Sequence, residues 1–551
     1  MFGETDEENS AEEADNDGFD SDLDLDRIQG QLNEESGSES EEDSDVSSVE
    51  EESWTDQLEN VMLNDFEGDP GVKVPVPNDA KEIDFFSFLF GDSEIDILVR
   101  ETNRFARQKL ANMPPRLALW KDATLQEMKA YIGMWIVMGI NVLPEIAMYW
   151  SNDSFIGNDG IKAVMTKNRF EELAQYLHFN DSTQEPPRGD VNHDRLYKIR
   201  PILSNVLRNI QASYYPGKNI SIDEGMVAFK GRLGFRQYMP AKPTKYGIKV
   251  WMAADAESAY VVNFSVYLGS EENGAPRIHG LGYETVMKMA RPYLNKYHHL
   301  FFDNYFSGMR LFEHLLMQNT YACATVRPNR KDLPLCAKAK LKEPGDLKVR
   351  QKGENILFTK WHDKRDVSFL SSNVSPDEPN REVERMVKGK RITIVKPYVS
   401  DLYTSKMGGV DRADQLRSSY TVGRPCKKWY RYLFWYALNL AICNARVLEN
   451  VHKRPATPKR QLDFRLALSK QLIGNFTQRK RASTGPIPAL NEAARSHKSV
   501  KLEKRKKECV QCKKDGKKTP RGRPIETKHK CKECDIALCQ DPCFARYHFP
   551  N

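Results

Sequence analysis

Three aspartates stand at places in the sequence where a carboxylate could bind a divalent metal ion. Asp223 lies in SIDEGM, at the close of an apolar run that reads as a strand, and Asp303 closes the apolar run HHLFF. Asp411 follows two glycines in GGVDRAD, at the start of a helical pattern. Carboxylates from strand ends and a helix terminus can converge on two Mg²⁺ ions, which stabilise the attacking and leaving oxygens of phosphoryl transfer. The set therefore predicts metal-dependent phosphoryl transfer.

Each of these aspartates also has a plainer interpretation. An aspartate at the end of a strand commonly forms a turn by hydrogen bonding to its own backbone. Asp414, three residues after Asp411, shares one side of the helix with it, and it is equally a first-turn acidic residue favoured by the helix dipole. Glu224 points to the opposite face of its strand and is left out of the set. The residues alone leave both interpretations open.

A second group of metal-ligand residue types lies near the C-terminal end. Six of the ten cysteines fall between positions 509 and 543, and two Cys-x2-Cys pairs are among them. Eight soft ligands would fill two tetrahedral Zn²⁺ sites, which we expect to be interleaved, and a segment this small needs metal to fold. The pairing of ligands with ions is not readable. The candidate ligands are Cys509, Cys512, His529, Cys531, Cys534, Cys539, Cys543 and His548.

The distribution of charge along the 551-residue chain indicates a polyanionic partner. The net charge of +5 conceals an acidic N-terminal region, because residues 1–60 hold 24 acidic residues and a single basic one, Arg27. Residues 451–551 hold 26 lysines and arginines against 9 acidic residues. A body this basic favours binding to nucleic acid, with a solvated basic surface as the alternative.

The elements that must position these residues follow from the apolar patterns. The stretch DATLQEMKAYIGMWIVMGI begins with a Thr124–Glu127 capping-box spacing and predicts an apolar helix, and two amphipathic helices follow it. From residue 218, five short aliphatic and aromatic runs read as strands of a mixed sheet, with one helix among them. KKWYRYLFWYALNLAICNARVLEN is apolar on nearly all sides, which predicts a buried helix.

These patterns predict an α/β core with an insertion, set within a mostly α-helical domain and followed by a small cysteine-rich domain. The N-terminal tail is too acidic and too poor in apolar residues to fold. The expected boundaries are a disordered acidic tail at 1–75, a helical domain at 76–217 and 422–475, the core at 218–330 and 396–421, an insertion domain at 331–395, a basic linker at 476–508 and the cysteine-rich domain at 509–551.

The sequence predicts a soluble protein of the nucleus with no membrane contact. The first residues are acidic rather than a secretory signal, and the most apolar stretch, residues 131–150, is interrupted by Asn141, Pro144 and Glu145. The basic runs QRKR and KLEKRKK suit nuclear import.

From about residue 82 onward the sequence resembles the piggyBac-type transposases, members of the DDE/D recombinase superfamily. ATLQEMKAYIG, RFEELAQYLHFND and DRLYKIRPIL are similar to the helical region of that family. SIDEGMVAFKGR, KPTKYGIKVW, FFDNYFSG and KMGGVDRADQ are similar to its catalytic blocks, and CKECDIALCQDPCFARYH to its cysteine-rich domain. Blocks this long, in the same order, make the resemblance specific.

The resemblance implies an RNase H-like core in which Asp223, Asp303 and Asp411 form the catalytic triad on two Mg²⁺ (or Mn²⁺) ions, with Asp414 contributing as well. It also implies cut-and-paste DNA transposition, with cleavage at transposon ends, hairpin intermediates and integration at TTAA sites. The expected partner is double-stranded DNA, and the helical domain is expected to serve DNA binding and dimerisation in a homodimer.

Two other functions fit the same residues. The first is a domesticated, catalytically silent DNA-binding protein that keeps the fold. The second is a zinc-dependent protein-interaction module, because a RING-like domain has similar cysteine spacing.

Basic residues around the first catalytic block are candidates for a DNA channel. Contacts from such residues to phosphates position DNA without reading its sequence. A solvated hairpin surface is the alternative of equal weight. The residues are Lys230, Arg232, Arg236, Lys242 and Lys245.

Overall fold

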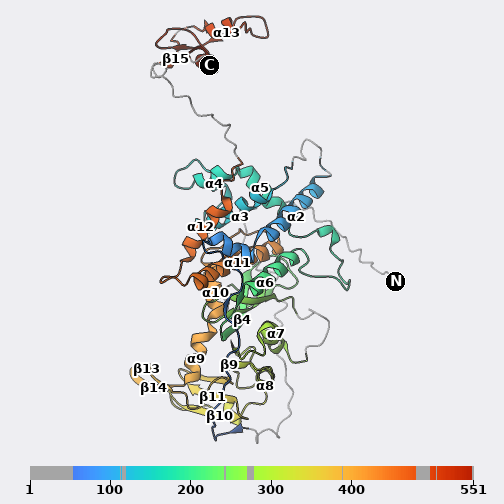
Figure 1. The fold of residues 1–551 in the computed structure, drawn as a ribbon, viewed down its shortest axis with the longest axis vertical. Helices are drawn as coiled ribbons and strands as arrows, with labels where there is room; N and C mark the ends of the chain where they lie inside the picture. The colour runs from blue at the N-terminus through green and yellow to red at the C-terminus, as the bar shows by residue number, and fades with distance from the viewer. Residues whose placement is uncertain are drawn as a thin grey trace, which may run out of the picture. The chain divides into compact units, whose positions relative to one another are not determined.

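A ten-stranded mixed β-sheet lies at the centre of residues 1–478, the first of two units into which the chain divides (Figure 1). Residues 479–551 form the second unit. The structure is a computed structural model, and it describes residues 54–111, 113, 120–240, 244–269, 278–387, 389–478, 497–503 and 505–548.

The strand order is β1-β10-β11-β12-β9-β8-β4-β6-β5, and β7 also pairs with β6. The strands are β1 (Trp54–Thr55), β4 (Asn219–Ala228), β5 (Gln237–Tyr238), β6 (Tyr246–Asp255), β7 (Val261–Val266), β8 (His299–Phe302), β9 (Tyr321–Thr325), β10 (Leu347–Lys352), β11 (Ile356–His362) and β12 (Asp366–Ser371). β4, β6 and β7 are antiparallel neighbours, whereas β8 is parallel to β4 and β9 is parallel to β8. The five runs predicted as strands after residue 218 are therefore confirmed as β4, β6, β7, β8 and β9.

Helices cover both faces of this sheet. The four that pack on it between and after the strands are α7 (Leu281–Ala290), α8 (Met309–Met317), α9 (Tyr398–Met407) and α10 (Gly409–Ser418). Phe302 of β8 contacts Phe312 of α8, with ring centroids 5.8 Å apart, so α8 lies on the face of Phe302. Phe301 points the other way and packs in a cluster with residues of α9. α9 and α10 therefore share the face of Phe301.

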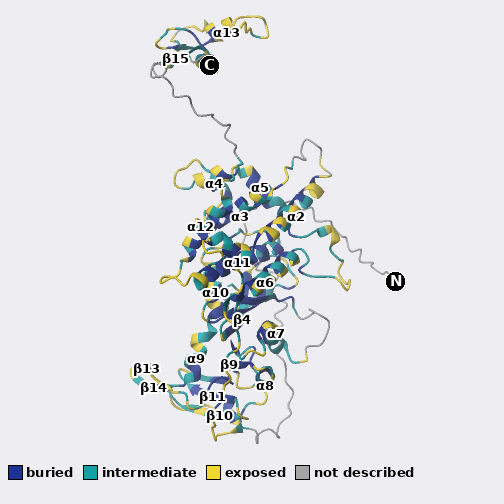
Figure 2. Ribbon diagram, viewed as in Figure 1, coloured by how far each residue is buried: buried dark blue, intermediate teal, exposed yellow. Residues whose placement is uncertain are grey.

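A layer of helices forms the rest of the first unit. Its helices are α1 (Glu82–Leu89), α2 (Asp92–Leu110), α3 (Leu125–Ile140), α4 (Asp159–Val164), α5 (Lys167–Tyr176), α6 (Arg200–Ser213), α11 (Trp429–Lys453) and α12 (Gln461–Ile473), with short 3-10 turns at η2 (Ile146–Trp150), η3 (Ser182–Gln184), η4 (Arg291–Tyr293) and η5 (Leu335–Ala337). The predicted cap of α3 is confirmed, because the Thr124 hydroxyl accepts the Glu127 N–H at 3.2 Å. α11 is buried as predicted and packs against α1 and α6 (Figure 2). Within the described ranges, every helix is too short or too polar to span a bilayer.

The segment predicted as an insertion domain is continuous with the sheet. Its strands β10, β11 and β12 form an antiparallel meander, and β12 pairs with β9, so they extend the sheet at the edge of β9. Only the hairpin β13 (Arg381–Val387) and β14 (Lys390–Lys396) forms a sheet of its own. β11 and β12 are mostly buried, so the polar residues of this segment lie mainly in β10, the β13–β14 hairpin and the connecting loops.

Residues 54–72 form an ordered strap, although the sequence predicts disorder for residues 1–75. β1 pairs with β10, Val61 is buried, and the ring of Phe66 lies 4.7 Å from that of His298. The strap ends in β2 (Gly71–Val72), which pairs with β3 (Tyr214–Tyr215) directly after α6. The prediction is wrong for this part because Trp54, Val61 and Phe66 bury enough apolar surface to offset the ordering entropy. Residues 1–53 lie outside the described residues.

The second unit is a small domain with little regular structure. Its elements are β15 (Ser499–Lys501), β16 (Lys507–Glu508), α13 (Val510–Lys514), β17 (Glu526–Thr527), β18 (His529–Cys531) and α14 (Cys543–His548). β15 pairs with β18, so residues from 497 onward belong to this domain and not to the predicted linker at 476–508. Its apolar core is limited to Leu538 and cysteine side chains, with a few partly buried neighbours.

Candidate functional site

The parallel pairing of β4 with β8 brings Asp223 next to Asp303. Asp303 directly follows β8, as predicted, but the expectation that Asp223 closes a strand is wrong, because β4 continues to Ala228 in its pairing with β6. In the parallel pairing, Ser221 lies opposite Phe301, and the same register continued by two residues sets Asp223 opposite Asp303. Side chains two residues apart share a face, so both carboxylates project from the face that α9 and α10 cover. Both residues are half-buried.

Asp303 combines the two interpretations that the sequence left open. Its Oδ1 accepts the Tyr305 N–H at 2.9 Å, which is the turn expected of an aspartate after a strand. Asp223 Oδ1 accepts the N–H of the next residue of β4, Glu224, at 2.8 Å. These hydrogen bonds orient the two carboxylates on adjacent strands. Asp303 therefore forms the turn and also occupies a candidate metal-ligand position.

The N-terminus of α10 is held against β4 by a close approach at Gly409. The Val410 N–H donates to Ser221 Oγ at 3.1 Å, and Ser221 is fully buried. A Cβ on Gly409 would collide with that same Oγ and would lie 3.2 Å from the carbonyl oxygen of Asp255. A glycine is therefore required at position 409 for the start of α10 to lie directly against Ser221. Ser221 is two residues before Asp223 on β4.

Asp411 and Asp414 differ in environment, although they lie one turn apart on α10. Asp411 is exposed in the first turn. Asp414 is half-buried, and its Oδ1 accepts from Arg417 Nε and Nη2, both at 3.2 Å. A Cβ on Gly225 would lie 3.2 Å from Asp414 Oδ2, so Asp414 sits over β4 just beyond Asp223. The guanidinium neutralises Asp414, whereas Asp411 faces solvent.

The four aspartates do not form a closed metal-ligand cluster. In the described part of the chain, the groups of three or more ligand atoms within 4.8 Å of one another are two sets of cysteines and histidines, and no aspartate belongs to them. The structure brings Asp223 and Asp303 together on adjacent parallel strands and places α10 on the same face. Hard carboxylate oxygens of this kind fit Mg²⁺ or Mn²⁺, which need few protein ligands because they retain several waters.

Tyr403 of α9 packs on the same face of the sheet as Phe301. Its ring lies edge-on to Phe369 of β12, with ring centroids 5.8 Å apart. Burial raises the pKa of the Tyr403 hydroxyl, and the charges of Asp303 and Asp223 raise it further. Tyr403 is therefore a neutral hydroxyl close to both carboxylates, and the sequence analysis did not identify it.

We expect Gly409→Ala to reduce the free energy of unfolding by about 1–3 kcal/mol, because the added methyl group must push α10 away from Ser221. Urea denaturation of the full chain measures this. Gly408→Ala is the matched control, because a Cβ at Gly408 meets no atom within 4 Å. Equal effects of the two substitutions would contradict the close approach.

The predicted DNA-binding residues fall into three groups. Lys230, Arg232 and Lys245 are exposed on the hairpin that extends β4 and β6. Arg236 is half-buried, and its Nη1 donates to the carbonyl oxygens of Lys230 at 3.0 Å and Gly231 at 3.1 Å, so it also closes the hairpin loop. Lys242 lies outside the described residues. A DNA channel at this hairpin stays a prediction.

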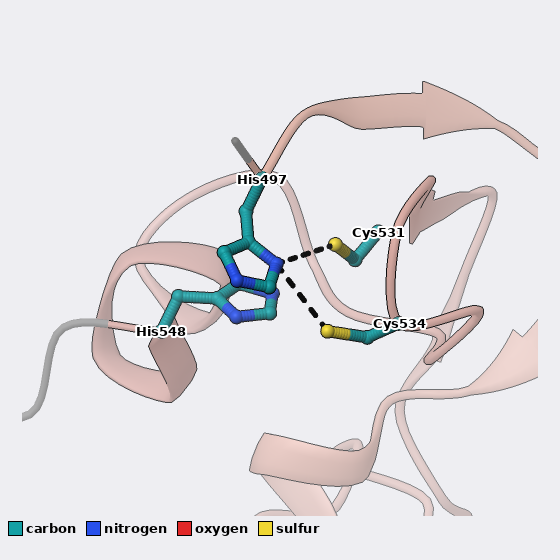
Figure 3. Close-up of side chains that lie close together, drawn as sticks. All are labelled: His497, Cys531, Cys534 and His548. Atoms are coloured by element: carbon teal, nitrogen blue, oxygen red, sulfur yellow. Dashed lines mark hydrogen bonds between the residues drawn. The ribbon is translucent and has the colours of Figure 1, made fainter. Parts of the chain in front are cut away.

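The second unit contains two interleaved sets of four potential metal ligands. One set is Cys509, Cys512, Cys539 and Cys543, and the other is His497, Cys531, Cys534 and His548. Figure 3 shows the second set, in which His497 Nδ1 lies 3.4 Å from Cys531 Sγ and 3.3 Å from Cys534 Sγ. The ligands alternate between the two sets along the chain, which gives the expected interleaving.

His529 belongs to neither set. The sequence analysis named His529 as a zinc ligand, but His497 occupies that position in the second set. His529 lies in β18 two residues before Cys531, a distance of about 6.6 Å along a strand. The pairing of Ser499 with Cys531 instead brings the start of β15, and with it His497, beside the cysteine. The rings of His497 and His548 stack with centroids 4.3 Å apart. The His529 assignment is therefore corrected.

The all-cysteine set has the dimensions of a tetrahedral zinc site. Cys512 Sγ lies 3.3 Å from Cys543 Sγ and 3.9 Å from Cys539 Sγ. Four thiolates around one Zn²⁺ at about 2.3 Å stand roughly 3.8 Å apart. Burial opposes a charge on Cys509, but the N–H groups of Cys512 and Cys539 donate to its sulfur and lower its pKa to about 7. The donor set thus favours a thiolate-binding cation.

Residues 81–446 match the family model described as Transposase IS4, and residues 492–549 match the DDE_Tnp_1-like zinc finger. Human PiggyBac transposable element-derived proteins 2 and 3 are relatives of the same chain. The chain belongs to the piggyBac-type transposase family. This confirms the resemblance seen in the sequence blocks, and it places the interleaved cysteine–histidine unit in the zinc finger of that family.

The relatives cover much of this piggyBac-type chain at low identity. Human PiggyBac transposable element-derived protein 2 is 28% identical over 399 residues, which are 70% of this chain and 64% of the relative. Protein 3 is 27% identical over 483 residues, 84% of this chain and 75% of the relative. The chain therefore spans about two thirds to three quarters of these relatives.

A solved structure confirms the fold. The cryo-EM structure of the piggyBac transposase synaptic complex with hairpin DNA has a TM-score of 0.63, 22% sequence identity, and coverage of 87% of this chain and 100% of the other. The mixed α/β core and the cysteine-rich C-terminal unit predicted from the sequence agree with these matches.

Proposed function

We propose that this piggyBac-type protein is a cut-and-paste DNA transposase that cleaves transposon ends and integrates at TTAA sites. The observation that carries the proposal is the placement of Asp223 on β4 beside Asp303 at the end of the parallel strand β8, with the first turn of α10 docked on the same face. Carboxylates at such positions serve metal-dependent phosphoryl transfer without a side-chain nucleophile.

We infer that the α/β core is RNase H-like, which would support this function. Three antiparallel strands, β7, β6 and β4, are followed by β8 and β9, which are parallel to β4, in the order β7-β6-β4-β8-β9. This arrangement puts the carboxyl ends of β4, β8 and β9 at one edge, where ligands of three different chain segments meet.

The residues that would hold two Mg²⁺ or Mn²⁺ ions are Asp223, Asp303 and Asp411. The bound ions would supply charge neutralisation and in-line alignment of the attacking and leaving oxygens. The chain itself orients the carboxylates through the N–H groups of Glu224 and Tyr305. Arg417, which pairs with Asp414 at 3.2 Å, donates to the carbonyl oxygen of Met226 in β4 at 3.5 Å and so ties α10, which carries Asp411, to β4.

The remaining parts of the chain fit a DNA substrate. The exposed Lys230, Arg232 and Lys245 would contact phosphates of double-stranded DNA next to β4 and β6. The two ligand sets of the second unit would each bind one structural Zn²⁺ and fold it for recognition of transposon ends. We propose that the protein acts in the nucleus as a homodimer, with the helical layer as the dimerisation surface.

The second candidate is a domesticated protein that binds DNA but does not cut it. The observation that favours it is that the human relatives are named as transposable element-derived proteins. Both candidates predict binding to transposon ends, so only cleavage separates them.

An excision assay tests the proposal. Purified full-length protein is incubated with Mg²⁺ or Mn²⁺ and a plasmid that carries the DNA ends flanking its own gene. We expect excision that restores TTAA at the repaired junction, and we expect Asp223→Asn to lose it. Glu224→Gln is the matched control, because Glu224 lies opposite Trp251 and projects from the other face of the sheet.

Two results would contradict the proposal. Wild type that binds the ends without cutting them under either metal would favour the silent DNA-binding protein. Asp223→Asn that cuts as well as Glu224→Gln would remove the carboxylates from the mechanism.

A further inference from the structure

A hairpin of residues 517–525 extends from the all-cysteine ligand set of the second unit. Its first arm begins where the Lys517 N–H donates to the carbonyl oxygen of Cys512 at 2.9 Å. Its second arm ends where the carbonyl oxygen of Ile525 accepts the Cys509 N–H at 2.8 Å. Cys509 and Cys512 belong to one set of potential zinc ligands. Both ends of the hairpin are therefore fixed to the same candidate metal site.

The tip of this hairpin is a tight turn closed by Thr519. The Thr519 carbonyl oxygen accepts the Gly522 N–H, and the Thr519 N–H donates to the carbonyl oxygen of Arg523, both at 2.8 Å. The Thr519 hydroxyl also accepts the Arg523 N–H at 3.1 Å. Gly522 has a φ of 72°, a conformation that favours glycine, and the ring of Pro520 restricts its own φ. These bonds and residue types give the tip a preformed backbone shape.

The tip is exposed and strongly basic. Residues 513–523 hold six lysines and arginines against one acidic residue, Asp515, which lies 3.9 Å from Lys517. Arg521 and Arg523 are both exposed, and no carboxylate in the described part of the chain forms an ion pair with either of them. Two guanidinium groups at the end of the hairpin thus favour a polyanionic ligand.

The shape of the tip fits the minor groove of DNA better than the major groove. The minor groove is about 6 Å wide, whereas the major groove, about 12 Å wide, admits a helix or a whole two-stranded ribbon. Gly522 separates the two arginines without a side chain of its own, and a Cβ there would meet no atom within 4 Å, so the tip is narrow and unobstructed. Tracts of A·T pairs have a narrow minor groove with enhanced negative potential, which attracts arginine.

We propose that Arg521 and Arg523, with Gly522 between them, bind the minor groove of A·T-rich double-stranded DNA. Their N–H groups would donate to adenine N3 and thymine O2, whereas a G·C pair adds the guanine N2 amino group, a donor that no guanidinium can satisfy. Arginine suits this groove better than lysine, because a guanidinium is more weakly hydrated than an ammonium group. The inference rests on the proposed function, in which the second unit recognises DNA, and it names the groove and the base composition that this unit reads.

Binding of the zinc-loaded full-length protein to three labelled duplexes tests the inference. The duplexes share their flanks and differ in a central AATT, GGCC or IICC, in which inosine replaces guanine. Inosine lacks the N2 amino group but keeps the major-groove acceptors of guanine. Fluorescence anisotropy without divalent metal, so that no strand is cut, measures each affinity. We expect the AATT and IICC duplexes to bind about 10-fold more tightly than GGCC.

Two variants separate this groove contact from a general effect of charge. The double variant Arg521→Lys and Arg523→Lys keeps both positive charges, and it is expected to bind GGCC like wild type and to lose the preference for AATT and IICC. Lys514→Ala is the matched control, because Lys514 is exposed in α13 of the same unit and lies outside the tip. It is expected to keep the preference, since contacts to phosphate do not read sequence. Zinc content equal to that of wild type shows that the second unit of each variant is folded.

Three results would overturn the inference alone. The first is equal affinity of wild type for AATT and GGCC. The second is an IICC duplex that binds like GGCC, which would indicate reading in the major groove. The third is a preference that survives in the folded double variant, which would assign it to another part of the chain.

Failure of the proposed function gives a different pattern. Wild type that binds none of the three duplexes would remove DNA recognition together with the inference. A preference for AATT and IICC that depends on Arg521 and Arg523, in a protein that does not excise DNA, would support the inference and contradict only the proposed cleavage.

Discussion

Replacement of Asp303 by asparagine is expected to lower the rate of DNA strand cleavage by at least about 10³-fold while the fold is retained. The amide has the same shape as the carboxylate, and its oxygen can still accept the Tyr305 N–H that forms the turn. Only the negative charge is lost, and that charge is what a divalent cation requires. Cleavage of a labelled end duplex in Mg²⁺ measures the effect.

The free energy of unfolding of Asp303→Asn, unlike its cleavage rate, is not expected to fall. Asp223 and Asp303 are like charges opposite each other on adjacent strands, an arrangement that is destabilising by about 0.2–1 kcal/mol. In EDTA, Asp303→Asn is therefore expected to unfold at the same urea concentration as wild type or at a higher one. This separates a loss of chemistry from a loss of structure.

Asp401→Asn is a suitable control for the cleavage measurement. Asp401 lies on α9 and accepts from Arg381 at 2.8 Å and Lys396 at 2.6 Å, so it is engaged with the β13–β14 hairpin and not with the candidate metal-ligand aspartates. It is expected to cleave at the wild-type rate. Retention of more than about a tenth of wild-type activity by Asp303→Asn would contradict the metal-ligand assignment.

Removal of zinc is expected to unfold the second unit completely and to leave the first unit intact. The core of the second unit is Leu538 with its cysteines, far too little apolar surface for independent stability. Binding of structural Zn²⁺ contributes about 10–16 kcal/mol in comparable small domains. The free energy lost on metal removal is therefore larger than the stability that packing supplies. Hydrogen exchange by mass spectrometry on the full chain measures both units in one experiment.

The histidine assignment allows a sharper form of this test. His497→Ala is expected to release one of two bound zinc ions, because His497 contacts Cys531 and Cys534. His529→Ala is the matched control and is expected to retain both ions, since His529 belongs to neither ligand set. The reverse pattern of zinc release would return His529 to the ligand set.

Local patterns predicted most of the elements that build the candidate site. The apolar runs around Asp223 and Asp303 became parallel neighbours, and the GGVD sequence became a helix start on the same face. These predictions succeed because each depends on residues close in sequence. The exposed position of Asp411 and the ion pair of Asp414 with Arg417 depend on how α10 lies on β4, which no local pattern encodes.

The residues that the sequence did not reveal are brought into place by long-range pairing. Tyr403 lies on a helix with no unusual spacing, so its packing against Phe369 of β12 follows only from how α9 lies on the sheet. His497 precedes the cysteine pairs in a stretch that reads as linker, and the pairing of β15 with β18 recruits it. The segment that contains β10–β12 appeared polar because its loops and the β13–β14 hairpin are rich in charged residues, although β11 and β12 are mostly buried.

The strap at residues 54–72 has a consequence for how the first unit comes apart. One end of the strap, β1, is hydrogen-bonded to β10 at the outer part of the sheet. The other end, β2, is hydrogen-bonded to β3, which directly follows α6. Neither the outer meander nor the helical layer can open without releasing this shared segment. Regions joined in this way lose their structure as one cooperative unit rather than as separate subdomains. The N-terminal strap thereby couples the unfolding of the outer edge of the sheet to that of the helical layer.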